Sequence, residues 1–312
     1  MTDINLISIE TALAAIRSKI IKTPLINLSS LKTHSGNQIL IKAENLQPSS
    51  SFKIRGATYC ISLLSNEQKH KGIIAYSTGN HAQSVAMAAK SLGINATIVM
   101  STEAPQFKID ATIALGAQVI MSEPNSAARK ALAEELTQAY GLSLIPPYDH
   151  IDVITGQGTM GLEILEEQDI AAVFVPIGGG GLISGVAIAL KKKNSSIQVI
   201  GVEPELENDA FLSFKNGIRI SLNGPSFSIA DAIKVQTLGD ITYPIIQRYV
   251  DDIVTVNESD IIQAITLHKE KAALTVEPSG ALALAGALKY KLIFKSKKPV
   301  VCIASGGNVS PT

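Results

Sequence analysis

The sequence has 312 residues, of which 46% are hydrophobic and 17% are charged. That length can bury the core of one large or two medium domains, and the composition is that of a compact enzyme rather than a disordered scaffold. The 27 basic residues balance 27 acidic residues, and aromatic residues make up only 4%. These proportions argue against a nucleic-acid-binding surface.

The cysteines and the N-terminus indicate where the protein works. Cys60 and Cys302 stand alone, without a CxxC pair or the spacing of a zinc site. We therefore expect no disulfide framework and a reducing, cytoplasmic setting. The N-terminus lacks the basic-then-apolar order of a secretion signal, and no apolar run approaches the ~20 residues of a membrane helix.

Short apolar runs alternate with helical patterns along the chain. Strands are predicted at residues 38–42, 72–77, 96–100, 117–121, 171–177, 197–203, 252–256 and 299–304. Helices are predicted at residues 80–92, 126–140, 181–193, 259–273 and 279–291. This alternation predicts an α/β fold in which parallel sheets are flanked by helices.

Glycine-rich turns follow three of the predicted strands, at residues 77–80, 178–181 and 305–308. Ligands of open α/β sheets bind at the carboxyl ends of strands, so these turns are candidate binding segments. The sequence Ile-Pro-Pro-Tyr at residues 145–148 interrupts the pattern. We expect the chain to cross between two lobes there.

The turn formed by Gly178, Gly179, Gly180 and Gly181 is the strongest single feature. It follows the apolar run AAVFVPI and precedes the helical pattern LISGVAIALKKK. Four glycines let backbone N–H groups converge at a helix N-terminus, which favours a phosphate group. The alternative is a tight turn without a ligand. The turn is neither a Walker loop nor a GxGxxG fingerprint, so a nucleoside triphosphate is not predicted.

Lys53 and His81 are ambiguous when each is considered alone. Lys53, in SSFKIRGA, is either an ordinary solvated lysine or a buried lysine whose lowered pKa allows a Schiff base. His81, at a predicted helix start, is either structural or a hydrogen-bonding group. Their meaning depends on the rest of the sequence.

Five segments in a fixed order carry a resemblance. SSFKIRGA, STGNHAQSVA, GGGGLISG, VEPSGALALA and SGGN together resemble the fold-type II pyridoxal-phosphate enzymes, and most closely the threonine dehydratases and serine racemases. The resemblance runs from Thr23 to the C-terminus. It implies a two-lobed α/β fold like that of the tryptophan synthase β chain, with parallel-rich sheets flanked by helices. It also implies a large cofactor-binding domain at residues 1–71 and 150–312, a small mobile domain at 72–149, and a homodimer.

The resemblance further implies roles for individual residues. Lys53 would hold the cofactor covalently and act as a base at the substrate Cα, and Phe52 would stack beside the pyridine ring. Asn80 would bind the phenolic oxygen, and the glycines at 178–181 would hold the phosphate. Ser305 would pair with the pyridine nitrogen, and a neutral hydroxyl at that nitrogen suits elimination better than a long-lived carbanion.

One position in the segment STGNHAQSVA distinguishes a dehydratase from a racemase. Ser77, Thr78, Asn80 and His81 resemble the loop that holds the substrate carboxylate. At the position of Thr78, serine racemases have a serine that acts as a second acid–base group, whereas many threonine dehydratases have alanine. We predict an ammonia-lyase for threonine, serine or 3-hydroxyaspartate, and a serine or aspartate racemase with dehydratase side activity is the alternative.

Two further expectations follow from the resemblance. The complete set of motifs disfavours a catalytically idle ligand sensor that has only kept the fold. The chain stops soon after SGGN, without the regulatory extension of biosynthetic threonine dehydratases. We therefore expect a catabolic role and no inhibition by isoleucine.

An acidic segment at residues 203–209 has two interpretations. From the residues alone it is either a solvated acidic loop or a site for Mg²⁺ or Ca²⁺. The resemblance to the serine racemase branch implies a metal held by the Glu203 carboxylate, the Glu207 backbone carbonyl and the Asp209 carboxylate. Asp231, in SIADAIK, is either a helix cap or an active-site group.

Overall fold

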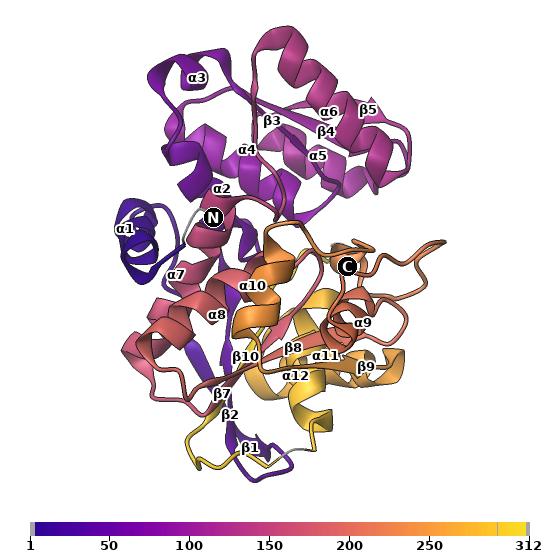
Figure 1. The fold of residues 1–312 in the computed structure, drawn as a ribbon. Helices are drawn as coiled ribbons and strands as arrows, with labels where there is room; N and C mark the ends of the chain where they lie inside the picture. Colours follow the sequence, from indigo (N-terminus) through magenta and orange to yellow (C-terminus); the bar gives the residue numbers. More distant parts are fainter. Residues whose placement is uncertain (1–3, 292, 310–312) are drawn as a thin grey trace.

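The computed structural model describes residues 4–291 and 293–309, and its strands form two sheets (Figure 1). One sheet has six strands in the order β1-β2-β10-β7-β8-β9, and the other has four in the order β5-β4-β3-β6. All neighbours are parallel except β1 and β2. The strands are β1 (Leu25–Lys32), β2 (Gln38–Lys42), β3 (Ile73–Tyr76), β4 (Ala96–Ser101), β5 (Gln118–Ser122), β6 (Ser143–Leu144), β7 (Ala172–Pro176), β8 (Gln198–Pro204), β9 (Asp252–Val256) and β10 (Val300–Ile303).

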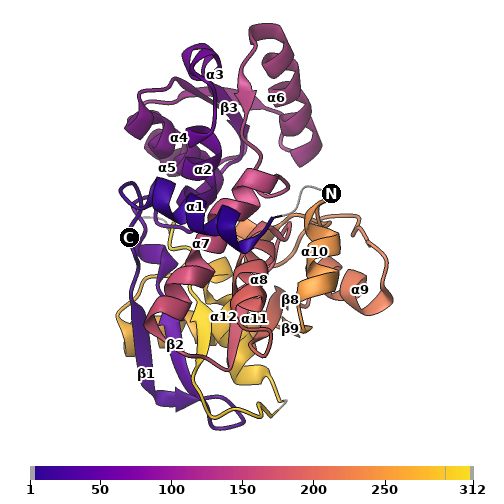
Figure 2. The same cartoon turned by 60° about the vertical axis from the view of Figure 1, so that its left-hand side comes forward.

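Helices flank both sheets, which confirms the predicted α/β fold with parallel-rich sheets. In both views the four-stranded sheet occupies the upper part of the molecule, and α2 and α7 lie between the two sheets (Figures 1 and 2). The helices are α1 (Leu6–Ile16), α2 (Lys53–Ser62), α3 (Asn66–Lys71), α4 (Asn80–Leu92), α5 (Gln106–Ala114), α6 (Ser126–Tyr140), α7 (Ile151–Glu167), α8 (Gly181–Lys193), α9 (Asp209–Asn216), α10 (Thr242–Tyr249), α11 (Glu258–Ala272) and α12 (Pro278–Lys289), with 3₁₀ turns η1 (Glu44–Leu46) and η2 (Asp231–Ile233).

Each sheet reverses its strand order at one place. In the six-stranded sheet the chain runs outward from β7 to β8 and β9, and β10 lies on the other side of β7. In the four-stranded sheet β4 and β5 lie on one side of β3, and β6 lies on the other. Ligands of open α/β sheets bind beyond the carboxyl ends of strands at such reversals. The segments that follow β7, β10, β3 and β6 are therefore the candidate site.

Glycines allow α7 to pack very closely between α2 and α8. A methyl group at Gly156 would stand 2.7 Å from the Cα atom of Gly56 in α2. A methyl group at Gly158 would stand 2.9 Å from the carbonyl oxygen of Gly185 in α8. No side chain fits at such separations, so these positions require glycine. Because α2 begins at Lys53, this packing also fixes where Lys53 lies.

The predicted domain boundaries stay a prediction. Strands β3 to β6 all lie within residues 72–149, and α3, which precedes that range, contacts β6. No helix in the described part of the chain is both long enough and apolar enough to cross a membrane.

Candidate active site

Lys53 is the first residue of α2, which packs against both α4 and α7. Its Nζ donates a hydrogen bond of 2.6 Å to the carbonyl oxygen of Pro147, and the centroid of the Phe52 ring lies 5.3 Å from Nζ. Burial lowers the pKa of the Lys53 amine to about 8. A fraction of the amine is therefore uncharged near neutral pH, and an uncharged amine can act as a nucleophile or a base.

His81 is anchored to the crossing segment, the name we give to residues 145–149 between β6 and α7. Its Nε2 lies 2.8 Å from the carbonyl oxygen of Ile145, and because a carbonyl can only accept, Nε2 carries a proton. Burial, and to a lesser degree the positive charge of Lys53, lowers the pKa of His81 to about 3. The ring is thus neutral and links the start of α4 to the crossing segment.

The glycine turn leads from β7 into α8. Gly180, the N-cap residue of α8, has φ of +89°, a conformation that favours glycine. Tyr148 of the crossing segment packs on Gly179, where an added methyl group would overlap the tyrosine ring. Neither α8 nor α4 has a side-chain cap. Their first N–H groups are therefore available to anions, and the candidate site contains two such helix N-termini.

Asn80 joins three segments that are distant in the sequence. Its Nδ2 donates to Oε1 of Glu277, and its Oδ1 accepts from Nδ2 of Asn308. Burial raises the pKa of Glu277 to about 7, against the opposing effect of the Asn80 hydrogen bond. Sequence reasoning assigned no role to Glu277, although the segment VEPSG that contains it was part of the resemblance.

Ser305 follows β10 and lies beside the start of α2. The Phe52 N–H donates a 3.1 Å hydrogen bond to the Ser305 carbonyl oxygen. The Ser305 hydroxyl donates a long hydrogen bond of 3.4 Å to the carbonyl oxygen of Ser279. A bond of that length is weak, so the hydroxyl is held loosely.

Residues 77–79 form the loop between β3 and α4. The Ser77 hydroxyl oxygen accepts a 3.3 Å hydrogen bond from the Gly79 N–H. Thr78 is half-buried, and within the described part of the chain its hydroxyl has no hydrogen-bond partner. The backbone therefore does not hold the Thr78 hydroxyl in place.

The acidic segment brings two buried carboxylates together. Glu203 accepts hydrogen bonds of 3.2 and 2.7 Å from two N–H groups in the first turn of α9, whereas the buried Oδ2 of Asp209 has no partner among the described residues. Burial raises the pKa of both carboxyl groups, to about 7 for Asp209, and the charge of Asp209 raises that of Glu203 further. The Glu207 side chain accepts from the Phe227 N–H at 3.1 Å.

Asp231 begins the 3₁₀ turn η2 and forms no side-chain cap. Its carboxylate pairs with Nζ of Lys108 in α5 at 2.9 Å. This ion pair connects a helix beside the four-stranded sheet to the loop that precedes α10.

Comparison with known proteins shows the family of the chain. Residues 16–306 match the family described as pyridoxal-phosphate dependent enzyme. The chain is 43% identical over 295 residues to L-threo-3-hydroxyaspartate ammonia-lyase of Saccharomyces cerevisiae, covering 94% of this chain and 90% of that protein. It is 42% identical over 307 residues to L-threonine ammonia-lyase of Thermotoga maritima, covering 98% and 76%. The solved structure of maize serine racemase superimposes with a TM-score of 0.94 at 37% identity, covering 98% and 94%. The chain therefore belongs to the pyridoxal-phosphate-dependent enzyme family.

Proposed function

We propose that this protein is an ammonia-lyase that converts a small β-hydroxy amino acid (threonine, serine or 3-hydroxyaspartate) to a 2-oxo acid and ammonia. The observation that carries the proposal is the environment of Lys53, whose amine donates to the Pro147 carbonyl oxygen and has its pKa lowered by burial to about 8. Two of the similar proteins bear the names of ammonia-lyases for such substrates.

The residues present fit pyridoxal phosphate. The uncapped N-terminus of α8 beyond the turn 178–181 suits a phosphate group. The Lys53 amine suits the cofactor carbonyl, the neighbouring Phe52 ring suits the pyridine face, and the loosely held Ser305 hydroxyl suits the ring nitrogen. The Asn80 side-chain amide, which donates one N–H to Glu277, would donate its second N–H to the phenolic oxygen.

The chemistry divides between the cofactor and the chain. Bound cofactor supplies an electron sink that acidifies the Cα–H bond of the amino acid. Lys53 removes that Cα proton, because its lowered pKa leaves an uncharged amine available. The N-terminus of α4, with Ser77, Asn80 and His81 around it, holds the substrate carboxylate. The β-hydroxyl takes up a proton and leaves as water, and the Cα proton that Lys53 removed balances this uptake. Hydrolysis of the resulting enamine then gives the 2-oxo acid and ammonia.

A substrate panel tests this proposal. The holoenzyme is incubated with the L- and D-forms of threonine, serine and 3-hydroxyaspartate, and with alanine, which has no β-hydroxyl. We expect equal amounts of 2-oxo acid and ammonia from at least one L-hydroxy amino acid and none from alanine. If folded, cofactor-loaded protein deaminates none of the hydroxy amino acids, the proposal is wrong.

Racemisation is the second candidate, and Thr78 is the observation that favours it. Racemisation needs an acid–base group on the face opposite Lys53, and the hydroxyl of Thr78 is free of backbone hydrogen bonds in the described part of the chain. We expect Thr78→Ala to spare most L-dehydration and to abolish activity on D-substrates. Thr78→Ser, which lacks the restricting methyl group, should raise D-directed activity. Chiral chromatography measures the activities of both variants on L- and D-substrates. An unchanged ratio of D-directed to L-directed activity in Thr78→Ala would exclude the acid–base role of Thr78.

We also propose that Mg²⁺ or Ca²⁺ binds the Glu203 carboxylate, the Glu207 backbone carbonyl and the Asp209 carboxylate. Support comes from the unpartnered Oδ2 of Asp209 and from the raised pKa values of both carboxyl groups. Two buried carboxylates that repel each other are stabilised by a divalent cation with oxygen ligands.

This metal proposal predicts a pH-dependent stability. In the folded protein the pKa of Asp209 is about 7, above the value of about 3.9 in an unfolded chain. The metal-free folded state then binds the proton more tightly, so its stability falls as pH rises from about 4 to about 7. Added Mg²⁺ should raise the melting temperature Tm by about 4 °C at a hundred times its Kd at pH 8, and by less at pH 5.5.

Matched variants identify the site. Asp209→Asn should remove the Mg²⁺ effect and weaken the fall in stability with pH. Glu205→Gln alters an exposed carboxylate of the same loop that pairs with Lys289, and it should leave the Mg²⁺ effect intact. Equal Tm values with chelator, Mg²⁺ and Ca²⁺ at pH 8 would exclude the metal.

A further inference from the structure

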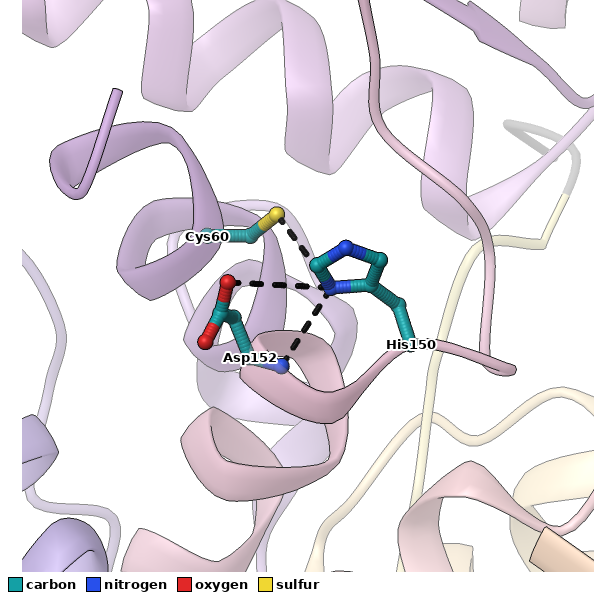
Figure 3. Close-up of side chains that lie close together, drawn as sticks. All are labelled: Cys60, His150 and Asp152. Carbon is teal, nitrogen blue, oxygen red and sulfur yellow. Dashed lines mark hydrogen bonds and ion pairs between the residues drawn. The ribbon is translucent and has the colours of Figure 1, made fainter. Parts of the chain in front are cut away.

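A cluster of three possible metal ligands lies outside the candidate active site (Figure 3). Cys60 comes from the last turns of α2, His150 is the N-cap residue of α7, and Asp152 lies in the first turn of α7. The Cys60 Sγ is 3.9 Å from Nδ1 of His150, and an Oδ2 atom of Asp152 is 3.8 Å from the same Nδ1. The three ligand atoms all lie within 4.8 Å of one another, and no other group of this kind occurs within residues 4–291 and 293–309.

These three donors have the chemistry of a zinc site. Zn²⁺ prefers thiolate, imidazole and carboxylate ligands in tetrahedral geometry. Bonds of about 2.3 Å to sulfur and about 2.0 Å to nitrogen place those two atoms about 3.5 Å apart at a tetrahedral angle. The observed separation of 3.9 Å exceeds this value by a few tenths of an ångström.

We propose that Cys60, His150 and Asp152 bind a Zn²⁺ ion, with a water molecule as the fourth ligand. An independent observation supports the water and an entry path. An open pocket of about 470 Å³ is lined by all three side chains and by residues of α3 and β6. Solvent therefore reaches the cluster, although Cys60 itself is buried. Three protein ligands plus water is a common arrangement for zinc.

The imidazole of His150 and the charge balance favour zinc binding, whereas the thiol of Cys60 has to lose its proton. Nδ1 of His150 accepts a long 3.3 Å hydrogen bond from the Asp152 N–H, so its lone pair is present and only weakly engaged. Burial, and to a lesser degree the negative charge of Asp152, raises the pKa of the Cys60 thiol to about 12, which disfavours the thiolate, so the zinc–sulfur bond has to offset the cost of deprotonation. On binding, zinc forms a bond to sulfur and the thiol proton passes to solvent. The thiolate and the Asp152 carboxylate then balance the two positive charges of the ion.

The site would join two elements that hold the active centre. α2 begins at Lys53, and His150 directly follows the crossing segment, which contacts Lys53, His81 and the glycine turn. A bound ion would tie the C-terminal part of α2 to the start of α7. Because it binds only the folded state, zinc should raise Tm, by about 4 °C at a hundred times its Kd.

The experiment uses the holoenzyme saturated with Mg²⁺, which removes competition from the site at Glu203 and Asp209. Co²⁺ serves as the spectroscopic probe, because tetrahedral Co²⁺ absorbs in the red, away from the cofactor. Zn²⁺ retained after gel filtration is measured by elemental analysis, and Tm is recorded with and without Zn²⁺. We expect one ion per chain and a tetrahedral Co²⁺ spectrum that added Zn²⁺ displaces.

Variants assign the ligands. Cys60→Ser and Asp152→Asn should each weaken zinc binding by at least about tenfold and should lose the tetrahedral Co²⁺ spectrum. His34→Gln removes an exposed histidine of the turn between β1 and β2, and it should bind zinc like the wild type. If a variant fails to fold, the Co²⁺ spectrum of the wild type still tests whether the protein has a tetrahedral metal site. The proposal is overturned if the wild type gives no tetrahedral Co²⁺ spectrum, or if folded Cys60→Ser and Asp152→Asn bind Zn²⁺ as tightly as it does.

Discussion

Replacing Lys53 with alanine should lower kcat by about a thousandfold or more, because a single side chain supplies both the covalent attachment and the base. The fold should survive the change. In the described structure the Lys53 amine makes one hydrogen bond, to Pro147, and its burial as a charged group is unfavourable. The glycine turn and the N-terminus of α8 are unaltered, so the variant should still bind pyridoxal phosphate, but without a covalent link.

Borohydride reduction followed by peptide mapping measures the covalent link directly. In the wild type the cofactor should be fixed to the peptide that contains Lys53, and in Lys53→Ala no lysine should be labelled. Lys130→Ala removes an exposed lysine of α6 and should behave like the wild type. Labelling of another lysine in the wild type would show that the assignment is wrong. Attachment to the apoenzyme should also become faster as pH rises towards 8, where the Lys53 amine loses its proton.

Several elements could be predicted with their observed bounds because local physics determines them. The strands at residues 38–42 and 252–256 and the helices at 126–140 and 181–193 agree with β2, β9, α6 and α8. Strands buried in parallel sheets read as continuous apolar runs. A cap marks the start of α6, where the Asn125 side chain accepts from the Ala128 N–H.

Helix α7 was not predicted, and its glycines explain why. Gly156, Gly158 and Gly161 each lower helix propensity by about 1 kcal/mol relative to alanine. Tertiary packing compensates, since each glycine faces α2 or α8 at a distance that admits no side chain. Local patterns contain no information about such neighbours.

The sequence predicted those parts of the candidate site that lie in recognisable motifs, and no others. The glycine-rich turns were expected at the carboxyl ends of strands, and residues 77–80, 178–181 and 305–308 do follow β3, β7 and β10. The fold adds the start of α2, where the Phe52 N–H donates to the Ser305 carbonyl oxygen. The cluster of Cys60 with His150 could not be predicted, because 90 residues separate them and no local spacing marks a pair brought together by the fold. Their roles, like those of the other site residues, stay predictions.

Arg55 shows the same limit within the motif SSFKIRGA, where sequence reasoning gave it no role. Its guanidinium is fully buried and donates to both oxygens of Glu44, each at 2.8 Å, and to both oxygens of Glu163, at 2.8 and 2.7 Å. Nζ of the buried Lys42 lies 2.9 Å from the same Glu163 carboxylate. The network connects α2 to α7 and to the segment after β2, directly behind the helix start that carries Lys53.

Replacing Arg55 with alanine should therefore lower the free energy of unfolding by about 3–5 kcal/mol, because it leaves buried carboxylates without their partner. Chemical denaturation measures the loss, and Arg248→Ala, which removes an exposed arginine of α10, should cost no more than about 0.5 kcal/mol. The pH dependence of the stability loss shows whether it comes from the lost charge of Arg55 or only from its lost packing. Burial alone would raise the pKa of Glu44, and the Arg55 guanidinium overcomes that effect and holds the pKa below its usual value.

Glu44 then contributes stability that is present at neutral pH and is lost as pH falls through its depressed pKa. Without Arg55 the burial effect is unopposed, so Glu44 should take up a proton at a higher pH and lose its unfavourable charge. The difference in unfolding free energy between wild type and Arg55→Ala should be largest near pH 7 and should shrink towards pH 4. Adding Glu44→Gln to Arg55→Ala should recover part of the loss at pH 7, since the uncompensated charge is gone. A loss that is the same at both pH values and unaffected by Glu44→Gln would mean that Arg55 acts through its volume and not through its charge.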